Sequence, residues 1–170
     1  MKKQTIDYRQ GAAETLKALA EGRVLLASRG RQGRANAMAI GWGTIGIIWG
    51  RPIFVVLVRP SRYTYTLIEE TGQFTVNVLP ATMTDVASYC GTHSGRDHDK
   101  IREEGLTEVP GERVALPTLA EAEITFECTV VHKNDVLPSE LARAVREGCY
   151  SGGDFHRLYF GEIMLCQRNA

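Results

Sequence analysis

Apolar, β-branched and aromatic residues occur along this chain in short runs, separated by polar segments rich in glycine and charge. Runs of this length are typical of strands, and the run 53–58 is apolar throughout, as in a strand buried on both faces. Alternation within 121–136 indicates one solvent-facing side. The pattern predicts strands over residues 23–28, 36–49, 53–58, 74–79, 121–136 and 158–166.

Helical spacing and helix-end signals fall between these runs. Ser61 has the chemistry of an N-cap before the segment "RYTYTLIEE", and Gly72 can end that helix. We expect helices over residues 12–22 and 62–70, a short helix within the polar segment 91–106, and a last helix over 139–148.

The order of these elements predicts the fold class. The glycine-punctuated turn "RGRQGRA" predicts that the segment 36–49 pairs back onto 23–28 as a hairpin. Mostly consecutive strands with a few short helices indicate a mainly β (α+β) fold with an antiparallel sheet in a closed or Greek-key barrel. A doubly wound sheet is disfavoured, because no G-x-G-x-x-G turn opens the helix within 53–79.

Length and composition limit the classes of protein. A chain of 170 residues predicts one domain, residues 1–170. Twenty basic and twenty acidic residues give a formal net charge of zero, which argues against a general affinity for nucleic acid. No apolar run reaches the roughly 18 residues of a membrane helix, and no apolar region follows "MKKQTIDYRQ" as in a signal peptide. We therefore expect a cytoplasmic protein without a membrane partner.

The four cysteines carry no recognised motif. They are widely spaced and form no C-x-x-C pair, so a disulfide framework or a zinc site is disfavoured. Free cysteine is among the most buried residue types. We interpret Cys90, Cys128, Cys149 and Cys166 as core thiols in a reducing compartment.

The junction between the apolar run 53–58 and the helix that follows it has the composition of an anion site. A helix start presents free N–H groups and the positive end of the helix dipole. Arginine forks and hydroxyls at that position add further donors to an anion. The donors are Arg59, Ser61, Arg62 and Thr64. The alternative is that the two arginines are simply solvated at a helix start.

The segment "CGTHSGRDHDK" permits three interpretations. Cys90 and His93 suggest a thiol nucleophile with its base, although no third residue orients them. A metal site is a second interpretation, without a recognised ligand spacing; its ligands would be His93, Asp97, His98 and Asp99. The third interpretation, a cofactor loop closed by Arg96 and Lys100, is the one we favour.

Four segments in this order and spacing carry a family resemblance: "RGRQGRANAMAIGW", "RPSRYTYTLIEETGQFTVNVL", "CGTHSGRDHDK" and "DFHRLYFGEI". Together they resemble the flavin reductase-like family of FMN-binding split barrels, and within it the flavoredoxin-like branch. The resemblance implies a six-stranded antiparallel Greek-key split barrel with short peripheral helices. It also implies a homodimer that holds FMN at or near the subunit interface.

The resemblance assigns roles residue by residue. A phosphate dianion is the partner expected for arginine forks, hydroxyls and helix N–H groups. The family's phosphate-side motif matches Arg59, Ser61, Arg62 and Thr64. The segment along the flavin matches Asn36, Ala37, Met38 and Trp42, and Ala39 belongs to the same segment. The family's "SGRD-x-DK" loop matches Ser94, Gly95, Arg96, Asp97 and Lys100, and the resemblance implies that Lys100 is a further phosphate or ribityl contact. No metal is implied.

Several residues keep alternatives open. The family commonly has threonine where this chain has Ala39, so one hydrogen bond to the cofactor is absent and altered binding is expected. His156 matches a histidine near the active face, and its alternative is a surface histidine. Trp42 is the tryptophan within the motif, whereas Trp49 is expected in the core or an interface. Tyr159 and Phe160 wall the site or fill the core, and Arg29, Arg31 and Arg34 are expected at an exposed hairpin tip.

The implied function is an FMN-dependent oxidoreductase. It would take hydride from NADH or NADPH and pass electrons to free flavin, a metal chelate or a protein, with the redox chemistry belonging to the flavin. Two alternatives stay open: an FMN electron carrier of the flavoredoxin type that never meets a nicotinamide, and a split-barrel binding protein without redox turnover.

Overall fold

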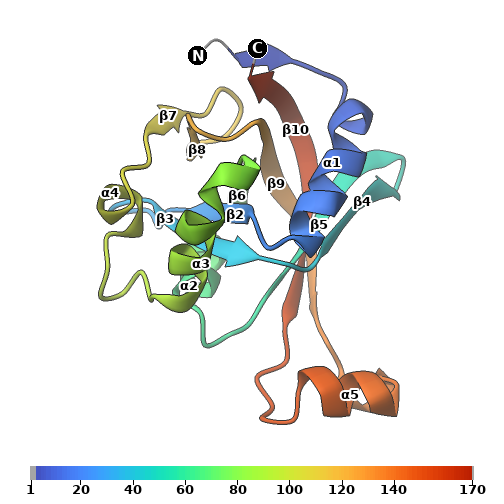
Figure 1. Cartoon of the computed structure of the whole chain (residues 1–170). Coiled ribbons are helices and arrows are strands. Elements are labelled where there is room, and N and C mark those ends of the chain that lie inside the picture. The colour runs from blue at the N-terminus through green and yellow to red at the C-terminus, as the bar shows by residue number, and fades with distance from the viewer. Residues whose placement is uncertain (1–2, 170) are drawn as a thin grey trace.

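A computed structural model describes residues 3–169 and has one large antiparallel sheet as its framework (Figure 1). Its strand order is β3-β2-β6-β9-β10-β5-β4, with β1 paired to β10, and a small second sheet joins β7 to β8. The strands are β1 (Lys3–Thr5), β2 (Val24–Ser28), β3 (Asn36–Ile40), β4 (Gly43–Ile48), β5 (Arg51–Val58), β6 (Gln73–Val78), β7 (Glu108–Pro110), β8 (Pro117–Leu119), β9 (Ile124–Asp135) and β10 (Arg157–Asn169).

Short helices cover this framework. Figure 1 shows α3 and α2 beside β3, and α5 at the far end of the β9–β10 hairpin. The helices are α1 (Tyr8–Ala20), α2 (Tyr63–Thr71), α3 (Thr84–Thr92), α4 (Lys100–Glu103) and α5 (Arg143–Cys149), with single 3₁₀ turns at η1 (Ala81–Met83) and η2 (Pro138–Glu140). No helix among residues 3–169 has the length and apolar content needed to span a membrane.

The fold class predicted from the sequence is confirmed: the molecule is mainly β, antiparallel, with peripheral helices. Two details differ. The sheet has eight strands where the resemblance implies six, and it is open, because β3 and β4 end the strand order without pairing to each other. The unit β5–α2–β6 is not a parallel pair, since β9 and β10 lie between its two strands. The ends of the predicted domain, residues 1, 2 and 170, lie outside the described residues.

The predicted strand 36–49 is wrong as a single element. The strand is interrupted at Gly41 and Trp42. β3 pairs with β2 in the predicted hairpin, whereas β4 lies at the other edge of the sheet and pairs with β5. Gly43 permits the crossing, because a Cβ there would lie 2.9 Å from the carbonyl oxygen of Val55. The other predicted strands are confirmed with small shifts at their ends.

The helices depart more from prediction. The first begins at Tyr8, earlier than expected, because Asp7 and Gln10 form a capping box. Ser61 is not the N-cap of α2: Arg62 holds that position and makes no side-chain cap, whereas Gly72 ends the helix at φ 65° as predicted. The prediction omitted α3 entirely.

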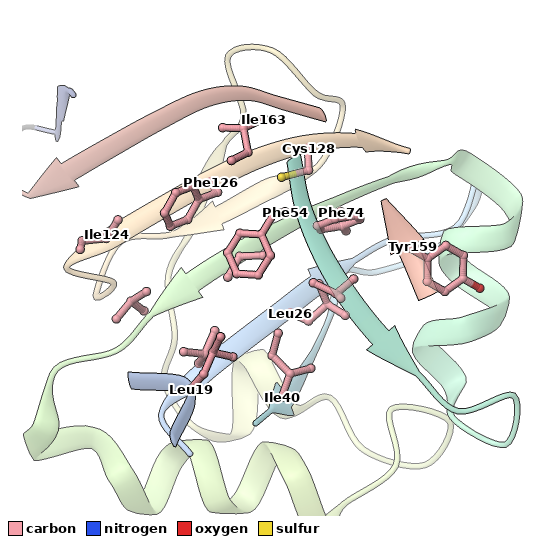
Figure 2. Close-up of a cluster of buried hydrophobic side chains, with 14 of the residues drawn as sticks. Leu19, Leu26, Ile40, Phe54, Phe74, Ile124, Phe126, Cys128, Tyr159 and Ile163 are labelled. Atoms are coloured by element: carbon pink, nitrogen blue, oxygen red, sulfur yellow. The ribbon is translucent and has the colours of Figure 1, made fainter. Parts of the chain in front are cut away.

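The main core lies on the inner face of the sheet. Figure 2 shows Phe54, Phe74 and Phe126 packed between the strands, and the rings of Phe54 and Phe126 meet edge to face with centroids 5.3 Å apart. A second cluster joins Leu25 and Ala37 to the buried face of α3. This second cluster fixes α3 against β3 and thereby positions the candidate site.

Three of the four cysteines lie in the core as interpreted, whereas Cys149 in α5 does not. Cys90, Cys128 and Cys166 are buried, Cys149 is half-buried, and none forms a disulfide. Burial raises the pKa of Cys166 to about 12, so its thiol is protonated at neutral pH.

Candidate functional site

Two adjoining cavities lie where β3, the β5–α2 junction and the end of α3 meet. The first has a volume of about 210 Å³ and the second about 130 Å³. Both are lined by Met38, Arg62 and Gly91, so they adjoin, and the two together are called the cleft below. The first cavity is also lined by Ala39, Ile40, Gly41, Trp42, Leu57, Arg59 and His156, and the second by Asn36, Ser61, Tyr63, Thr64, Cys90, His93, Ser94, Gly95, Arg96 and Lys100.

The structure brings together nearly all of the residues predicted for the site. Segments from four separate parts of the sequence, ending with His156, line this one cleft. The exceptions are Ala37 and Asp97, which line neither cavity. Ala37 is fully buried in the second core cluster, which joins β3 to α3. Asp97 is an exposed residue of the turn before α4.

One wall of the second cavity is held by a buried hydrogen bond. Asn36 Nδ2 donates to Thr64 Oγ1 at 2.9 Å and thereby joins β3 to the first turn of α2. Gly95 packs directly against this pair: an added Cβ would overlap Asn36 Oδ1 and lie 2.7 Å from Asn36 Cγ. Only glycine fits at this position of the 93–100 loop.

The start of α2 offers donors to an anion. Because Arg62 provides no side-chain cap, the first-turn N–H groups at Tyr63 and Thr64 have no acceptor within the helix. The exposed Arg62 side chain lines both cavities, and no group among residues 3–169 accepts a hydrogen bond from its guanidinium. Arg96 adds a second positive charge, with its carbon Cζ 5.5 Å from the ring centroid of Tyr63.

Arg59 and Ser61 are already engaged by the chain itself. The Arg59 guanidinium donates to the backbone carbonyls of Cys149, Gly153 and Asp154 at 3.0, 3.3 and 3.0 Å. The Ser61 hydroxyl donates to Asp154 Oδ2 at 2.6 Å. Arg59 lines the first cavity and Ser61 the second, but their polar groups face the segment 149–154 as well as the cleft.

Lys100 lies deeper than its predicted role suggests. Its side chain is buried, and its Nζ donates to the Cys90 carbonyl in the last turn of α3 at 2.8 Å. Burial lowers the pKa of Lys100. Lys100 also lines the second cavity, so it ties α3 to the loop beside the cleft.

His156 is the predicted catalytic residue and lies in the wall of the first cavity. Its Nδ1 is 2.7 Å from the Tyr150 hydroxyl, and its ring lies 5.0 Å from the ring of Trp42, centroid to centroid. Burial, reinforced by the nearby charge of Arg59, lowers the pKa of His156 to about 4. The imidazole is therefore neutral at physiological pH.

The thiol nucleophile is not supported. Burial raises the pKa of Cys90 to about 11, so the thiol remains protonated at neutral pH. His93 instead stacks on Tyr89 with ring centroids 3.9 Å apart, and its Nδ1 lies 3.2 Å from the Tyr89 carbonyl. For the metal interpretation, residues 3–169 contain no group of three or more His, Cys, Asp or Glu side chains arranged to hold an ion.

The remaining candidates lie outside the cleft. Tyr159 is in the core and donates its hydroxyl to Glu69 Oε1 at 2.8 Å, whereas Phe160 packs against Trp49 and His132 on the outer face. Of the predicted hairpin tip, Arg31 and Arg34 are exposed and Arg29 is half-buried.

Sequence reasoning missed two kinds of site residue. Tyr150 lies in the connection between α5 and β10, and nothing in its local sequence signals that it contacts His156. Asp154, which contacts Ser61, begins the quoted motif "DFHRLYFGEI" but carried no assigned role. Gly91 and Tyr63 were within quoted motifs but carried no assigned role. Gly91 is a close-approach glycine, because a Cβ there would lie 3.2 Å from Ala39 Cβ, and the local sequence does not signal this approach.

The open antiparallel sheet with short peripheral helices is similar in fold to a solved structure with a split-barrel domain from Shewanella frigidimarina, with a TM-score of 0.71 over 96% of this chain and 75% of that one. The family model for the flavin reductase-like domain matches residues 16–169. The chain therefore belongs to the flavin reductase-like family, as the sequence motifs implied.

Individual relatives agree with this assignment. Flavoredoxin of Desulfovibrio vulgaris (Miyazaki F) is 29% identical with a TM-score of 0.69, over 86% of this chain and 68% of that one. Flavoredoxin from Methanosarcina acetivorans is 27% identical with a TM-score of 0.69, over 86% and 67% of the two chains. An uncharacterized protein of Aeropyrum pernix is 34% identical over 125 residues, 73% of this chain; the match spans 47% of that protein's length.

Proposed function

We propose that the protein binds FMN in this cleft and acts as an FMN-dependent oxidoreductase. The observation that carries the proposal is Arg62, which lines both cavities at the uncapped start of α2 and whose guanidinium has no acceptor within the described residues. An unpaired guanidinium beside free N–H groups is a ready partner for a phosphate. The flavin-binding relatives and the family match support the same ligand.

The two ends of the cleft suit the two ends of FMN. The second cavity offers Arg62, Arg96 and the Thr64 hydroxyl to the phosphate and ribityl groups. The first cavity offers an apolar surface of Met38, Ala39 and Trp42 to the flavin ring. When bound, FMN would supply the electron-transfer chemistry, and the protein would supply binding, orientation and electrostatics.

His156 borders the proposed flavin position as a neutral ring. With a pKa of about 4, it offers one N–H donor and one lone pair at neutral pH and adds no positive charge. The Tyr150 hydroxyl engages Nδ1, so Nε2 is the nitrogen left for a ligand. We propose that His156 orients the flavin or a nicotinamide through Nε2.

The two candidate activities differ in the electron donor that reduces the flavin. We propose NADH or NADPH as the donor, with a flavin, metal chelate or protein as acceptor. The similarity to flavoredoxins favours a second candidate, an FMN electron carrier reduced by another protein. Anaerobic mixing of the FMN-loaded protein with NADH or NADPH separates them: rapid bleaching of flavin absorbance supports the first, and bleaching only by another reduced protein supports the second.

We also propose a homodimer in the cytoplasm. The edge strand β4 and its turn expose Ile47 at 62% and Trp49 at 60%, the most exposed large apolar residues of the described chain. Exposed apolar residues beside an unpaired strand edge are typical of an interface. The free thiols support a reducing compartment.

The proposed phosphate-binding site at Arg62 is tested by the variant Arg62→Ala. A charge-assisted contact of about 1.5–3 kcal/mol corresponds to a loss of roughly ten- to a hundredfold in FMN affinity. Calorimetric titration should find this loss for FMN and little change for riboflavin, which has no phosphate. Arg113→Ala is the matched control, because Arg113 is an exposed arginine that lines neither cavity.

Two results would contradict the proposal that Arg62 binds the phosphate of FMN. One is equal affinity of the parent protein for FMN and riboflavin. The other is an Arg62→Ala variant that folds and binds FMN as tightly as the parent.

A further inference from the structure

The segment between α5 and β10 is tied back to the β5–α2 junction by side chains at both of its ends. It runs from Cys149 to His156, and Figure 1 shows it joining α5 at the tip of the long β9–β10 hairpin to the body of the sheet. Few of its residues are buried. Its position therefore depends on specific polar contacts rather than on a core of its own.

Arg59 makes most of these contacts. Its two terminal nitrogens donate to the carbonyls of Cys149, Gly153 and Asp154. Its carbon Cζ also lies 5.1 Å from the ring centroid of Tyr150. A planar fork can satisfy several carbonyls at once, which a lysine ammonium on a flexible stem does less well.

Ser61 and Asp154 close the other side of the segment. The carboxylate accepts from the Ser61 hydroxyl at 2.6 Å and from the Ser61 N–H at 3.3 Å. Asp154 adopts φ 55°, a conformation that aspartate tolerates better than most residues. The two groups that would otherwise be open to a ligand phosphate are thus occupied by the chain.

The contacts matter because of what the segment carries. Tyr150 and His156 both belong to it; they bond to each other at 2.7 Å and pack against Trp42, which lines the first cavity. His156 is also held from the sheet, because its carbonyl accepts from the Val136 N–H at 2.9 Å, so the contacts of the segment bear on the position of its ring.

We propose that Arg59, Ser61 and Asp154 form a latch that holds the segment 149–156 on the cleft and thereby positions His156. The ligand phosphate then falls to Arg62, while Arg59 and Ser61 act as positioning residues. The importance of the latch for the reaction rests on the proposed function. The effect of the latch on the position of the segment is independent of that function, and it can be tested without flavin.

The test is a variant that weakens the latch without changing charge, Arg59→Lys/Ser61→Ala. The groups that act on His156 are Arg59, Asp154 and Arg62, together with the Tyr150 hydroxyl. In the parent, proton NMR should find the His156 ring titrating at about 4, with His156→Gln identifying its signal. In the variant, release of the ring into water should raise its pKa towards about 6.5.

Hydrogen exchange gives a second readout. Amide exchange across residues 149–156 should become at least about tenfold faster in the variant, because this segment would open locally while the sheet remains folded. Ser61→Thr keeps the hydroxyl and should behave like the parent. Arg62→Lys is the control for charge at the cleft, and it should leave both readouts unchanged while weakening FMN binding.

Asp154→Asn distinguishes a latch from a local charge effect. The Asp154 carboxylate raises the pKa of His156, so its removal alone lowers that pKa, and asparagine retains an acceptor for Ser61. In Asp154→Asn the pKa of His156 is therefore expected to fall or to stay unchanged. The proposal is overturned if the folded double variant keeps His156 near 4 with unchanged exchange, or if Arg62→Lys opens the segment equally. Should the double variant not fold, exchange in Ser61→Ala alone decides in the same way.

Discussion

Gly95 lies so close to a wall of the cleft that no side chain fits at this position. Its Cα packs on the Asn36 amide, which in turn is bonded to Thr64 at the start of α2. Three segments that are distant in sequence therefore meet at one contact. The glycine in "SGRD" is explained by this approach and not by backbone conformation, because Gly95 is not among the residues with positive φ.

We expect Gly95→Ala to damage both stability and binding. The new methyl group must displace Asn36 and break its bond to Thr64, at a cost typical of overpacking, about 1–3 kcal/mol. Urea unfolding measures the loss of stability, and FMN titration should show weaker binding. Gly46→Ala is the control: no atom lies within 4 Å of its added Cβ, and it should unfold like the parent. A Gly95→Ala variant as stable as the parent would refute this account.

At this scale the sequence predicted which residues gather, but not what each one contacts. The order of the motifs placed Arg59, Ser61 and Arg62 together, since they lie within one junction. Arg59 binds carbonyls of the segment 149–154, about ninety residues further along the chain, whereas Arg62 has no acceptor in the part of the chain that the structure describes. No local pattern encodes such a partner.

β9 organises the loop between β7 and β8 through one buried carboxylate. Glu127 is 2% exposed and accepts hydrogen bonds from the backbone N–H groups of Glu112, Arg113 and Val114 at 3.0, 2.6 and 3.0 Å. A buried charge is tolerated when its lone pairs are filled in this way. The loop is thus attached to the central strand rather than packed by apolar contacts alone.

Glu127→Gln should destabilise the protein by about 2–3 kcal/mol, because an NH₂ group replaces one acceptor and faces a backbone donor. Equilibrium unfolding in urea measures this loss. Glu123→Gln changes a half-exposed carboxylate that forms a 3.6 Å surface ion pair with Arg23, and it should cost no more than about 0.5 kcal/mol. Equal stability of the two variants would show that the carboxylate does not hold the loop.

The helices and strands that were predicted correctly are those whose own residues carry a strong pattern. Strands such as β5, which are buried and continuously apolar, were found from the pattern. α3 was missed, because its residues include threonine, serine and glycine, and its stability comes from packing of Ala87 and Cys90 on β3. The split of 36–49 into two strands was missed because a glycine-containing apolar run does not reveal which neighbour each half will pair with.

The two edges of the sheet differ in how they are covered. β3 lies beneath α3 and the cleft, whereas β4 presents an unpaired edge. The turn after β4 holds Trp49 and Gly50 at positive φ, which keeps the indole exposed against Phe160 and His132. This edge is the surface that the proposed second copy would cover.

Ile47→Glu should convert the dimer to a monomer at micromolar concentration, because a charge would be buried at the proposed contact. Light scattering measures the mass, and thermal unfolding checks that the fold is kept. Leu16→Glu is the matched control, since Leu16 is also an apolar residue, 43% exposed, but lies on α1. A monomeric parent, or a dimer that survives Ile47→Glu, would rule out this interface.

The crossing between β3 and β4 has a consequence for folding kinetics. Two strands that are nearly adjacent in sequence lie at opposite edges of the sheet, and the strands between them include β6 from the middle of the chain and β9 and β10 from its last part. Such non-local pairing slows folding and makes the last contacts depend on all the others. The cleft uses residues from Asn36 to His156, so it is complete only after β10 has joined the sheet. A ligand of this cleft would bind the finished native state alone, and would stabilise it in proportion to the logarithm of the ligand concentration.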